Sequence, residues 1–149
     1  MNRIDLALFV YGTLRDREIL EGVLDHIVPQ GDLFEARARG WRTVYYPDRF
    51  YPALIRADQW AHGFVIVGLD GRDMKRLDDF EGDEYRRGAI TVEARGGTLG
   101  AQSYFPSKPV PREAPPWSFE TWTELHRPQT IARYRSDDFC QTHGNGRDQ

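Results

Sequence analysis

Cysteine is nearly absent from this chain, since Cys140 is the one cysteine among 149 residues. A single cysteine excludes an intrachain disulfide and fits a reducing compartment, so we expect a cytoplasmic protein. A surplus of basic residues is absent as well. The 20 Lys and Arg residues face 23 Asp and Glu residues, and the formal net charge is −3. This balance lacks the basic field typical of nucleic-acid-binding proteins, so we expect no nucleic-acid partner.

Long hydrophobic runs are also missing. The apolar stretch from Leu6 to Val10 is too short for a transmembrane helix. Asp5 before this stretch and Tyr11-Gly12 after it argue against a signal peptide. We therefore expect no membrane partner.

Several common catalytic signatures do not occur. The chain has no Gly-x-Ser-x-Gly elbow, no Gly-x-x-x-x-Gly-Lys phosphate loop and no Gly-x-Gly-x-x-Gly fingerprint. The histidines are far apart and show no paired-ligand spacing: His26, His62, His126 and His143. We expect no metal and no cofactor.

The composition itself is that of a soluble globular protein. Hydrophobic residues make up 40% of the chain and aromatic residues 13%. A chain of this length buries enough surface to fold without a disulfide or a metal. We expect one domain over residues 1–140 and a polar, disordered tail over residues 141–149.

Hydrophobic periodicity predicts the secondary structure. Runs of apolar residues and strict alternation indicate strands, and apolar residues three and four apart indicate amphipathic helices. Strands are expected at 5–11, 33–39, 41–45, 50–55, 62–69, 85–94 and 98–105, and helices at 16–27, from Asp70-Gly71 to Gly82, at 118–126 and at 128–139. A Gly96-Gly97 turn joins two of the strands, and a proline-rich spacer follows residue 105.

This order of elements favours an α+β fold. Strands outnumber helices, and the direct hairpin over residues 85–105 favours antiparallel pairing. We expect a small mixed or antiparallel β-barrel with flanking helices.

The segment Tyr11-Gly12-Thr13-Leu14 follows the first predicted strand and precedes the first predicted helix. A strand that turns through glycine into a helix leaves several backbone N–H groups unpaired, and these can bind an anion or an oxyanion. Spacing alone favours the alternative, an ordinary turn with Thr13 as the helix cap.

A second segment, residues 77–87, is rich in carboxylates, most of which would form a solvated face. Glu81 differs because it stands directly before Gly82, the expected helix end. The negative end of a helix and the neighbouring carboxylates both raise the pKa of such a group. In an apolar pocket it would exchange a proton near neutral pH.

Two motifs carry a resemblance to a known family. Tyr11-Gly12-Thr13-Leu14 lies about 65 residues before Leu77-Asp78-x-x-Glu81-Gly82-x-x-Tyr85-x-Arg87. In this order and spacing they resemble the γ-glutamyl cyclotransferase-like superfamily, and most closely its avirulence-induced-gene-like branch. The likeness covers residues 5 to about 125, and other segments fall in the family order: Gly40-Trp41-Arg42, Tyr51-Pro52-Ala53-Leu54, Gly63-x-Val65 and Tyr104.

The resemblance implies a mixed α+β fold around a small barrel and a small-molecule γ-glutamyl substrate. It implies cyclisation of a γ-glutamyl amine or amino acid to 5-oxoproline with release of the amine. Glu81 matches the essential glutamate of the family, which would act as general acid and base. The implied substrate-binding residues are the loop, with its backbone N–H groups, and two pocket tyrosines: Tyr11, Gly12, Thr13, Leu14, Tyr85 and Tyr104.

The chemistry is compatible with this sequence, because a tethered amine reaches its own carbonyl at high effective molarity. Two other hypotheses stay open. One is a non-catalytic module that binds a small carboxylate-bearing metabolite in the same pocket. The other is a protein-interaction domain that uses the helical end, Trp117–Tyr134.

Overall fold

The computed structural model describes residues 6–134. Cys140, His143 and the predicted tail over 141–149 lie outside the described residues. The described chain divides after Trp117 into a barrel unit and a helical unit, which begins at Ser118. The expectation of one domain over residues 1–140 stays a prediction.

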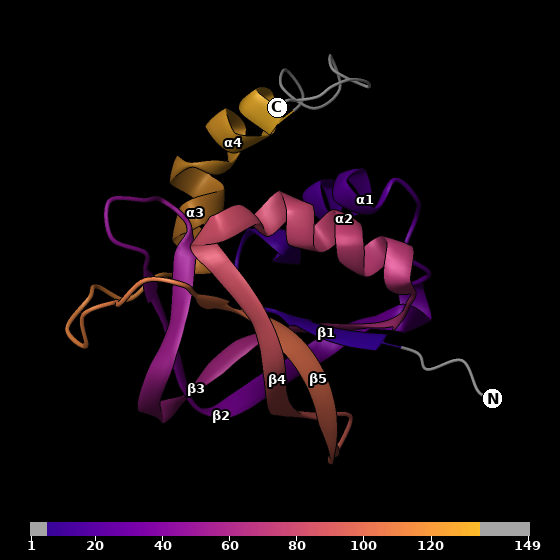
Figure 1. Cartoon of the computed structure of the whole chain (residues 1–149), viewed down its shortest axis with the longest axis horizontal. Helices are drawn as coiled ribbons and strands as arrows, with labels where there is room; N and C mark the ends of the chain where they lie inside the picture. The colour runs from indigo at the N-terminus through magenta and orange to yellow at the C-terminus, as the bar shows by residue number, and fades with distance from the viewer. Residues whose placement is uncertain (1–5, 135–149) are drawn as a thin grey trace. The chain divides into compact units, whose positions relative to one another are not determined.

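The barrel unit contains five strands that close on themselves (Figure 1). The strands are β1 (Leu6–Val10), β2 (Leu33–Tyr45), β3 (Pro52–Leu69), β4 (Tyr85–Ala94) and β5 (Gly97–Pro106). Their order around the barrel is β1-β3-β2-β4-β5. The closing pair, β1 with β5, is parallel and the other pairs are antiparallel. The predicted α+β class with a mixed barrel is confirmed.

The strands β2 and β3 are longer than the sequence pattern predicts. The expected strands at 33–39 and 41–45 are one strand, and those at 50–55 and 62–69 are another. The ladder between them continues from Leu33↔Ile66 to Tyr45↔Pro52, with one irregularity between Arg39 and Trp41. At this irregularity Gly40 adopts a φ of 90°, so the apolar alternation changes phase and hides the continuity.

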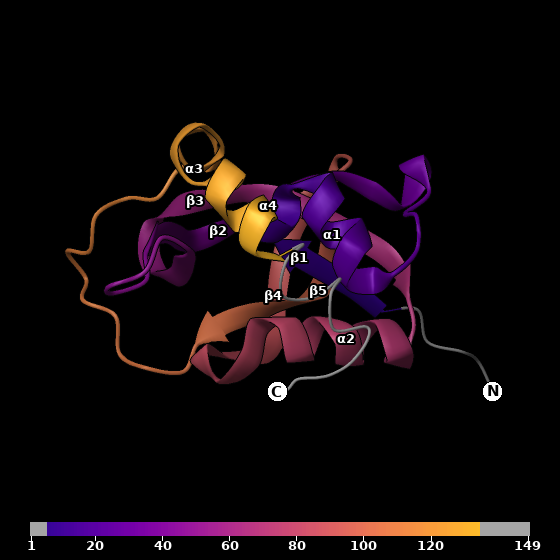
Figure 2. The ribbon, with the colours of Figure 1, turned by 90° about the horizontal axis from the view of Figure 1, so that it is seen from above.

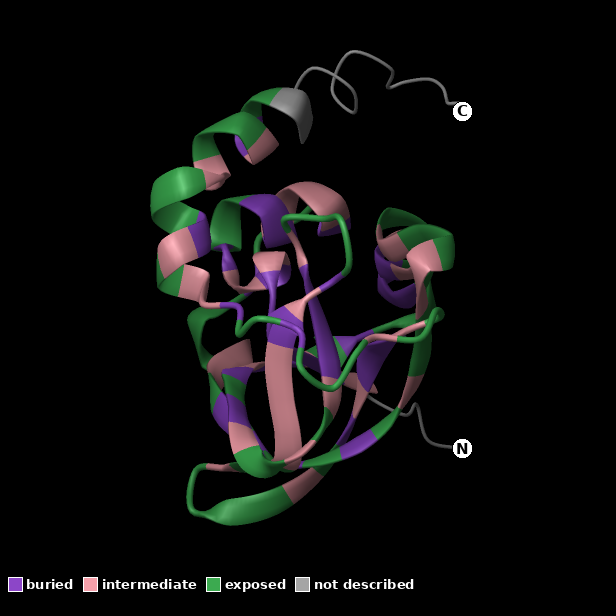
Figure 3. Cartoon of the chain, turned by 90° about the vertical axis from the view of Figure 1, so that its left-hand side faces the viewer, coloured by how far each residue is buried: buried purple, intermediate pink, exposed green. Residues whose placement is uncertain are grey.

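Apolar side chains fill the interior of the barrel. Small and large residues from every strand share this core, including Phe9, Ala38, Val65, Val92 and Phe105. In Figure 3, buried residues are interspersed with exposed ones along the strands. A side chain at Gly63 would collide with the neighbouring strand β1, because its Cβ would lie 2.2 Å from the Val10 carbonyl oxygen. The close approach of β1 to β3 therefore requires glycine at this position.

Two helices, α1 (Arg17–Leu24) and α2 (Gly71–Glu81), lie side by side above the strands in Figure 1 and again in the view from above (Figure 2). The guanidinium of Arg76 on α2 donates to the carbonyl of Leu24 at 2.9 Å. His26 joins the same contact, with 2.8 Å between its Nε2 and Oδ1 of Asp73. These bonds fix α2 beside α1.

Helix α1 is shorter than the predicted 16–27. Asp25 adopts the left-handed conformation, with φ 63°, and its N–H closes the last turn on Glu21 at 2.8 Å. Helix α2 matches its prediction more closely. It begins with a reciprocal capping box between Asp70 and Asp73, and Gly82 follows it with a φ of 69°.

The hairpin between β4 and β5 turns one residue earlier than predicted. Arg95 and Gly96 take the left-handed positions, with φ 52° and 78°. The proline-rich segment that follows β5 lies along β2, where Tyr45 N–H donates to the Pro115 carbonyl at 2.9 Å.

The helical unit contains two helices within the described residues. Helix α3 (Phe119–Leu125) begins after Ser118, whose hydroxyl accepts a bond from the Thr121 N–H at 3.0 Å. Helix α4 (Arg127–Tyr134) covers the first part of the predicted 128–139. Among residues 6–134, no helix has both the length and the apolar character needed to cross a membrane.

Candidate active site

The candidate site is centred on Glu81, the last residue of α2. Gly82 turns the chain sharply after it, so the Glu81 side chain stays at the end of the helix while the backbone turns away into β4. Burial, the main cause, and the negative charge of Asp78, the second cause, together raise the pKa of the Glu81 carboxyl to about 8. Among the described residues, this carboxyl has no hydrogen-bond or ion-pair partner. Glu81 can therefore exchange a proton near neutral pH.

The sequence predicts a raised pKa of Glu81 for two reasons, the helix end and the neighbouring carboxylates. Burial is the larger cause in the structure, and Asp78 is the one carboxylate that contributes. Asp79 is exposed and pairs with Lys75 at 3.2 Å, and Asp83 is also exposed. The acidic run as a whole is therefore not the source of the shift.

Glu84 illustrates the contrast within this run. It accepts a hydrogen bond from the hydroxyl of Tyr51 and another from Arg49 Nε at 3.1 Å. These contacts lower the pKa of Glu84, with the Tyr51 bond as the largest cause. Two carboxyls three residues apart thus differ in role, since Glu84 stays ionised while Glu81 is poised for proton transfer.

Three tyrosines lie within range of the charge of Glu81: Tyr11 directly after β1, Tyr85 at the start of β4 and Tyr104 on β5. Burial raises the pKa of all three hydroxyls, and the charge of Glu81 contributes to each shift. The structure therefore brings together Glu81 and the three tyrosines that the sequence singled out.

The hydroxyl protons of these tyrosines are directed at other acceptors. Tyr11 donates to the main-chain carbonyl of Tyr104 at 2.6 Å, and Tyr104 donates to Oδ1 of Asp78 at 2.6 Å. Tyr85 donates to the carbonyl of Pro52. Because each hydroxyl proton is already donated to another acceptor, none of the three tyrosines donates to the Glu81 carboxyl.

The loop from Tyr11 to Leu14 lies next to the same strands. Gly12 packs so closely on the Pro52 ring that an added Cβ would lie 2.7 Å from its Cγ. The Tyr85 hydroxyl donates to the carbonyl of the same proline, so the loop and Tyr85 both contact Pro52. Leu14 is buried, so this residue can offer a ligand its backbone rather than its side chain.

The local structure after Gly12 differs from the prediction. Thr13–Arg15 forms a single 3₁₀ turn, and α1 begins afterwards with Asp16 as its cap, which accepts from the Ile19 N–H at 3.2 Å. Thr13 is thus not the cap of the helix. The first bond of the turn runs from Arg15 N–H to the Gly12 carbonyl at 3.0 Å. The N–H groups of Thr13 and Leu14 precede that bond and have no acceptor within the turn.

The sequence predicts an effect of Asp78 on the pKa of Glu81 but no contact of Asp78 with Tyr104, and it predicts no role for Arg87 or Pro52. Asp78 stands three residues before Glu81 on α2, a spacing that places both side chains on one helix face. This spacing could have predicted that Asp78 lies close to Glu81. The contributions of Arg87 and Pro52 depend on strand register and loop packing, which no local pattern reveals.

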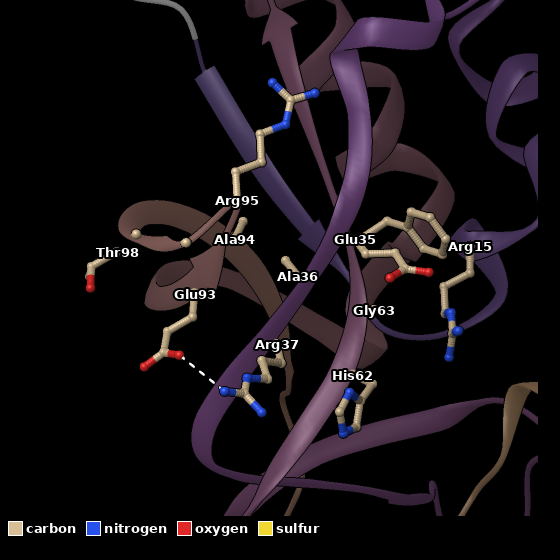
Figure 4. A pocket seen from close by; sticks show the side chains of 13 residues that line it. Arg15, Glu35, Ala36, Arg37, His62, Gly63, Glu93, Ala94, Arg95 and Thr98 are labelled. Carbon is tan, nitrogen blue, oxygen red and sulfur yellow. Dashed lines mark hydrogen bonds and ion pairs between the residues drawn. The ribbon is translucent and has the colours of Figure 1, made fainter.

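A separate cleft of about 720 Å³ lies between β2, β3 and the β4–β5 hairpin (Figure 4). Arg37 and Glu93 pair across it, with 3.4 Å between Nη2 and Oε1. Arg95 stacks on Phe34, with its guanidinium carbon 3.9 Å from the ring centre. The described residues that line this cleft include none of the predicted site residues. Nor do three His, Cys, Asp or Glu side chains within residues 6–134 cluster as metal ligands would.

The closed mixed barrel with a carboxyl at its helical end defines the class of the protein, the γ-glutamyl cyclotransferase-like fold. Solved structures of this fold superpose on most of the chain. A solution structure from Arabidopsis thaliana aligns with a TM-score of 0.70 at 22% identity, covering 99% of this chain and 90% of that one. A structure named gamma-glutamyl cyclotransferase aligns with a TM-score of 0.60 at 13% identity, covering 90% and 88% of the two chains.

The chain belongs to the family described as gamma-glutamyl cyclotransferase, AIG2-like, whose model matches residues 8–124. Among similar curated proteins, AIG2-like protein A of Arabidopsis thaliana is 26% identical over 143 residues, covering 93% of this chain and 85% of that protein. AIG2-like protein D of the same plant is 30% identical over 125 residues, covering 80% of each chain. The family that the two sequence motifs indicated is confirmed.

Proposed function

We propose that the protein is a γ-glutamyl cyclotransferase-type enzyme, which cyclises a γ-glutamyl amine or γ-glutamyl amino acid to 5-oxoproline and releases the amine. The observation that carries the proposal is the Glu81 carboxyl, which is unpaired among the described residues, has a pKa of about 8 and lies within range of three tyrosine hydroxyls. Family membership supports a reaction of this type.

Glu81 acts first as a base and then as an acid. The α-ammonium of the substrate gives a proton to the Glu81 carboxylate, and the resulting amine attacks the γ-carbonyl carbon. The ring C–N bond forms, the tetrahedral intermediate collapses and the bond to the leaving nitrogen breaks. Glu81 gives its proton to that nitrogen as the bond breaks. The ring nitrogen then passes its second proton through the Glu81 carboxylate to the released amine, which departs as an ammonium, so the lactam nitrogen is neutral and the enzyme ends in its starting state. A carboxyl with a pKa near the working pH suits both transfers.

The loop supplies the second element of catalysis. Negative charge develops on the γ-carbonyl oxygen in the intermediate and requires donors. The N–H groups of Thr13 and Leu14 precede the first bond of their turn and can serve as those donors. The rings of Tyr11, Tyr85 and Tyr104 then restrict the glutamyl chain to a ring-like conformation, in which the tethered amine reacts at high effective molarity.

The test is release of 5-oxoproline by the purified protein from a panel of γ-glutamyl amines and γ-glutamyl amino acids, followed by mass spectrometry. We expect turnover of at least one substrate and a loss of roughly 10²-fold or more in Glu81→Gln. Asp79→Asn removes a carboxylate from the exposed side of the same helix and is the matched control, which should keep the wild-type rate.

Two outcomes contradict the proposal. One is a full rate in Glu81→Gln. The other is absence of 5-oxoproline over the whole panel. In the second case, thermal stabilisation by small carboxylic acids that persists in Glu81→Gln would instead support the non-catalytic binding module.

A further inference from the structure

Asp78 occupies a junction between the candidate site and the protein surface. Its Oδ1 accepts a hydrogen bond from the Tyr104 hydroxyl at 2.6 Å and another from Arg87 Nε at 3.0 Å. Its Oδ2 accepts from Arg87 Nη2 at 3.2 Å. The carboxylate is thus held by a two-pronged guanidinium on one side and, on the other, by a tyrosine within range of the charge of Glu81.

Strand register explains why these groups meet. Arg87 on β4 and Tyr104 on β5 are direct cross-strand partners, so their side chains leave the same face of the hairpin. Asp78 reaches both from α2, three residues before Glu81. The chain of contacts continues inward, because the Tyr104 carbonyl accepts the Tyr11 hydroxyl. One connected network therefore joins α2, β4 and β5 to the residue that begins the loop after β1.

We infer that Asp78, clamped by Arg87, is a positioning residue of the candidate active site, which holds Tyr104 beside Glu81 and acts on Glu81 through its charge. This inference deepens the proposed function and rests on it. Asp78 needs no contact with the substrate for this role, since it works through Tyr104 and through the field at Glu81.

Among the described groups that act on Glu81, Asp78 is the one that carries a charge. Tyr11, Tyr85 and Tyr104 lie within range of the charge of Glu81, and burial keeps their hydroxyls neutral by raising the pKa of each. Asp78 is the carboxylate whose charge contributes to the raised pKa of Glu81. Arg87 partly cancels that charge, because it pairs with Asp78 at 3.0 Å.

The direction in which the Glu81 titration midpoint shifts in two variants therefore distinguishes this role from a merely structural one. Asp78→Asn removes the negative charge and should lower the midpoint of the Glu81 titration by roughly 0.5 to 1 pH unit, a modest shift because Asp78 is partly exposed. Arg87→Gln leaves the charge of Asp78 uncompensated and should raise the midpoint. A loosened fold would admit water to Glu81 in both variants and move both midpoints downward.

The experiment is an NMR titration of the full chain carrying ¹³C-labelled glutamate side chains, with Glu81 assigned from Glu81→Gln. Each variant is titrated beside Asp79→Asn, which changes the charge of the same helix on its exposed side and should leave the Glu81 midpoint in place. Thermal unfolding checks that every variant is folded. Tyr104→Phe breaks the bond to Asp78 without changing a charge, so it should lower turnover while the Glu81 midpoint moves by less than in Asp78→Asn.

Opposite shifts in Asp78→Asn and Arg87→Gln support the inference. Unchanged midpoints, or shifts of the same sign, overturn it. The titration needs no substrate, so it gives its answer even if the wild-type protein releases no 5-oxoproline, an outcome that would count against the proposed function alone. Where turnover is present, the acidic limb of the kcat/KM profile should move in the same direction as the Glu81 midpoint.

Discussion

The hydroxyl of Tyr11 donates to the main-chain carbonyl of Tyr104 at 2.6 Å, although the two residues are 93 positions apart in the chain. This buried bond joins the residue that begins the candidate site loop to the strand that closes the barrel. Because the donor and the acceptor are both buried, each would lose its partner without gaining water if the bond were removed.

Tyr11→Phe tests this link. The variant keeps the ring in the core but leaves the Tyr104 carbonyl without its donor, so we expect a loss of about 1 to 3 kcal/mol in the free energy of unfolding. Urea denaturation measures the change. Tyr45→Phe is the control, because the Tyr45 hydroxyl has no hydrogen bond to the residues described in the structure. Equal stability of the two variants would contradict the importance of the bond.

Glu81→Gln should stabilise the protein at alkaline pH. The pKa of Glu81 is about 8 in the folded chain against an ordinary value of 4.5, so the folded state keeps a proton that the unfolded state has released. Wild-type stability therefore falls as the pH rises from 4.5 through 8. Glutamine has no such titration, and we expect the variant to gain about 2 to 4 kcal/mol relative to wild type between pH 5 and pH 9.

Urea unfolding of both proteins at several pH values measures this difference. A stability difference that stays constant with pH would show that the Glu81 carboxyl titrates as an ordinary solvated group. The same result would weaken the proposed catalytic role, because that role depends on a proton held near neutral pH.

Gly12→Ala should displace the loop. The added methyl group would lie 2.7 Å from Cγ of Pro52, so either the loop or the proline ring must shift. A displaced loop moves the Thr13 and Leu14 N–H groups, and we expect a loss of about tenfold or more in kcat/KM for 5-oxoproline release. Gly97→Ala is the control, since an added Cβ there meets nothing within 4 Å. Equal activity of the two variants would show that the loop position has no part in turnover.

His26→Gln should weaken the contact between α1 and α2 in a pH-dependent way. The Ile27 carbonyl and then Asp73 raise the pKa of His26, so the stabilisation is complete below the ordinary pKa of 6.5 and is lost as the pH rises through the raised value. The His26 side chain is 46% exposed, which limits the effect to less than about 1 kcal/mol. Thermal unfolding at pH 5.5 and pH 9 should show a larger deficit at the lower pH, and a larger deficit at pH 9 would reverse the assigned sign.

Local patterns in the sequence were sufficient for the type of most elements, and they singled out Glu81 by its position before Gly82. Helix α2 follows from apolar residues at helical spacing and from the turn residues at its two ends. The continuity of β3 through Arg56 and Trp60 could not be predicted, because these side chains are not part of the apolar core that marks a strand. The pairing between strands supplies that information.

For the candidate site too, local sequence predicted some features, and others depend on residues distant in the chain. The raised pKa of Glu81 was expected from its position, but burial by residues distant in sequence is its main cause. The role of Arg87 depends on its register opposite Tyr104, which is set by a turn at Arg95 and Gly96 rather than at the predicted Gly96-Gly97. A shift of one residue in that register would move Arg87 to the other face of the strand.

Closure of the barrel has a kinetic consequence. The final pairing, Leu8 opposite Gln102, joins the first strand to the last, and it also brings the partners Tyr11 and Tyr104 together. Contacts so distant in sequence form late, because a long loop must be ordered before they are gained. During refolding, the candidate site should thus be completed in the last step, and recovery of the proposed 5-oxoproline release should lag behind recovery of helical signal.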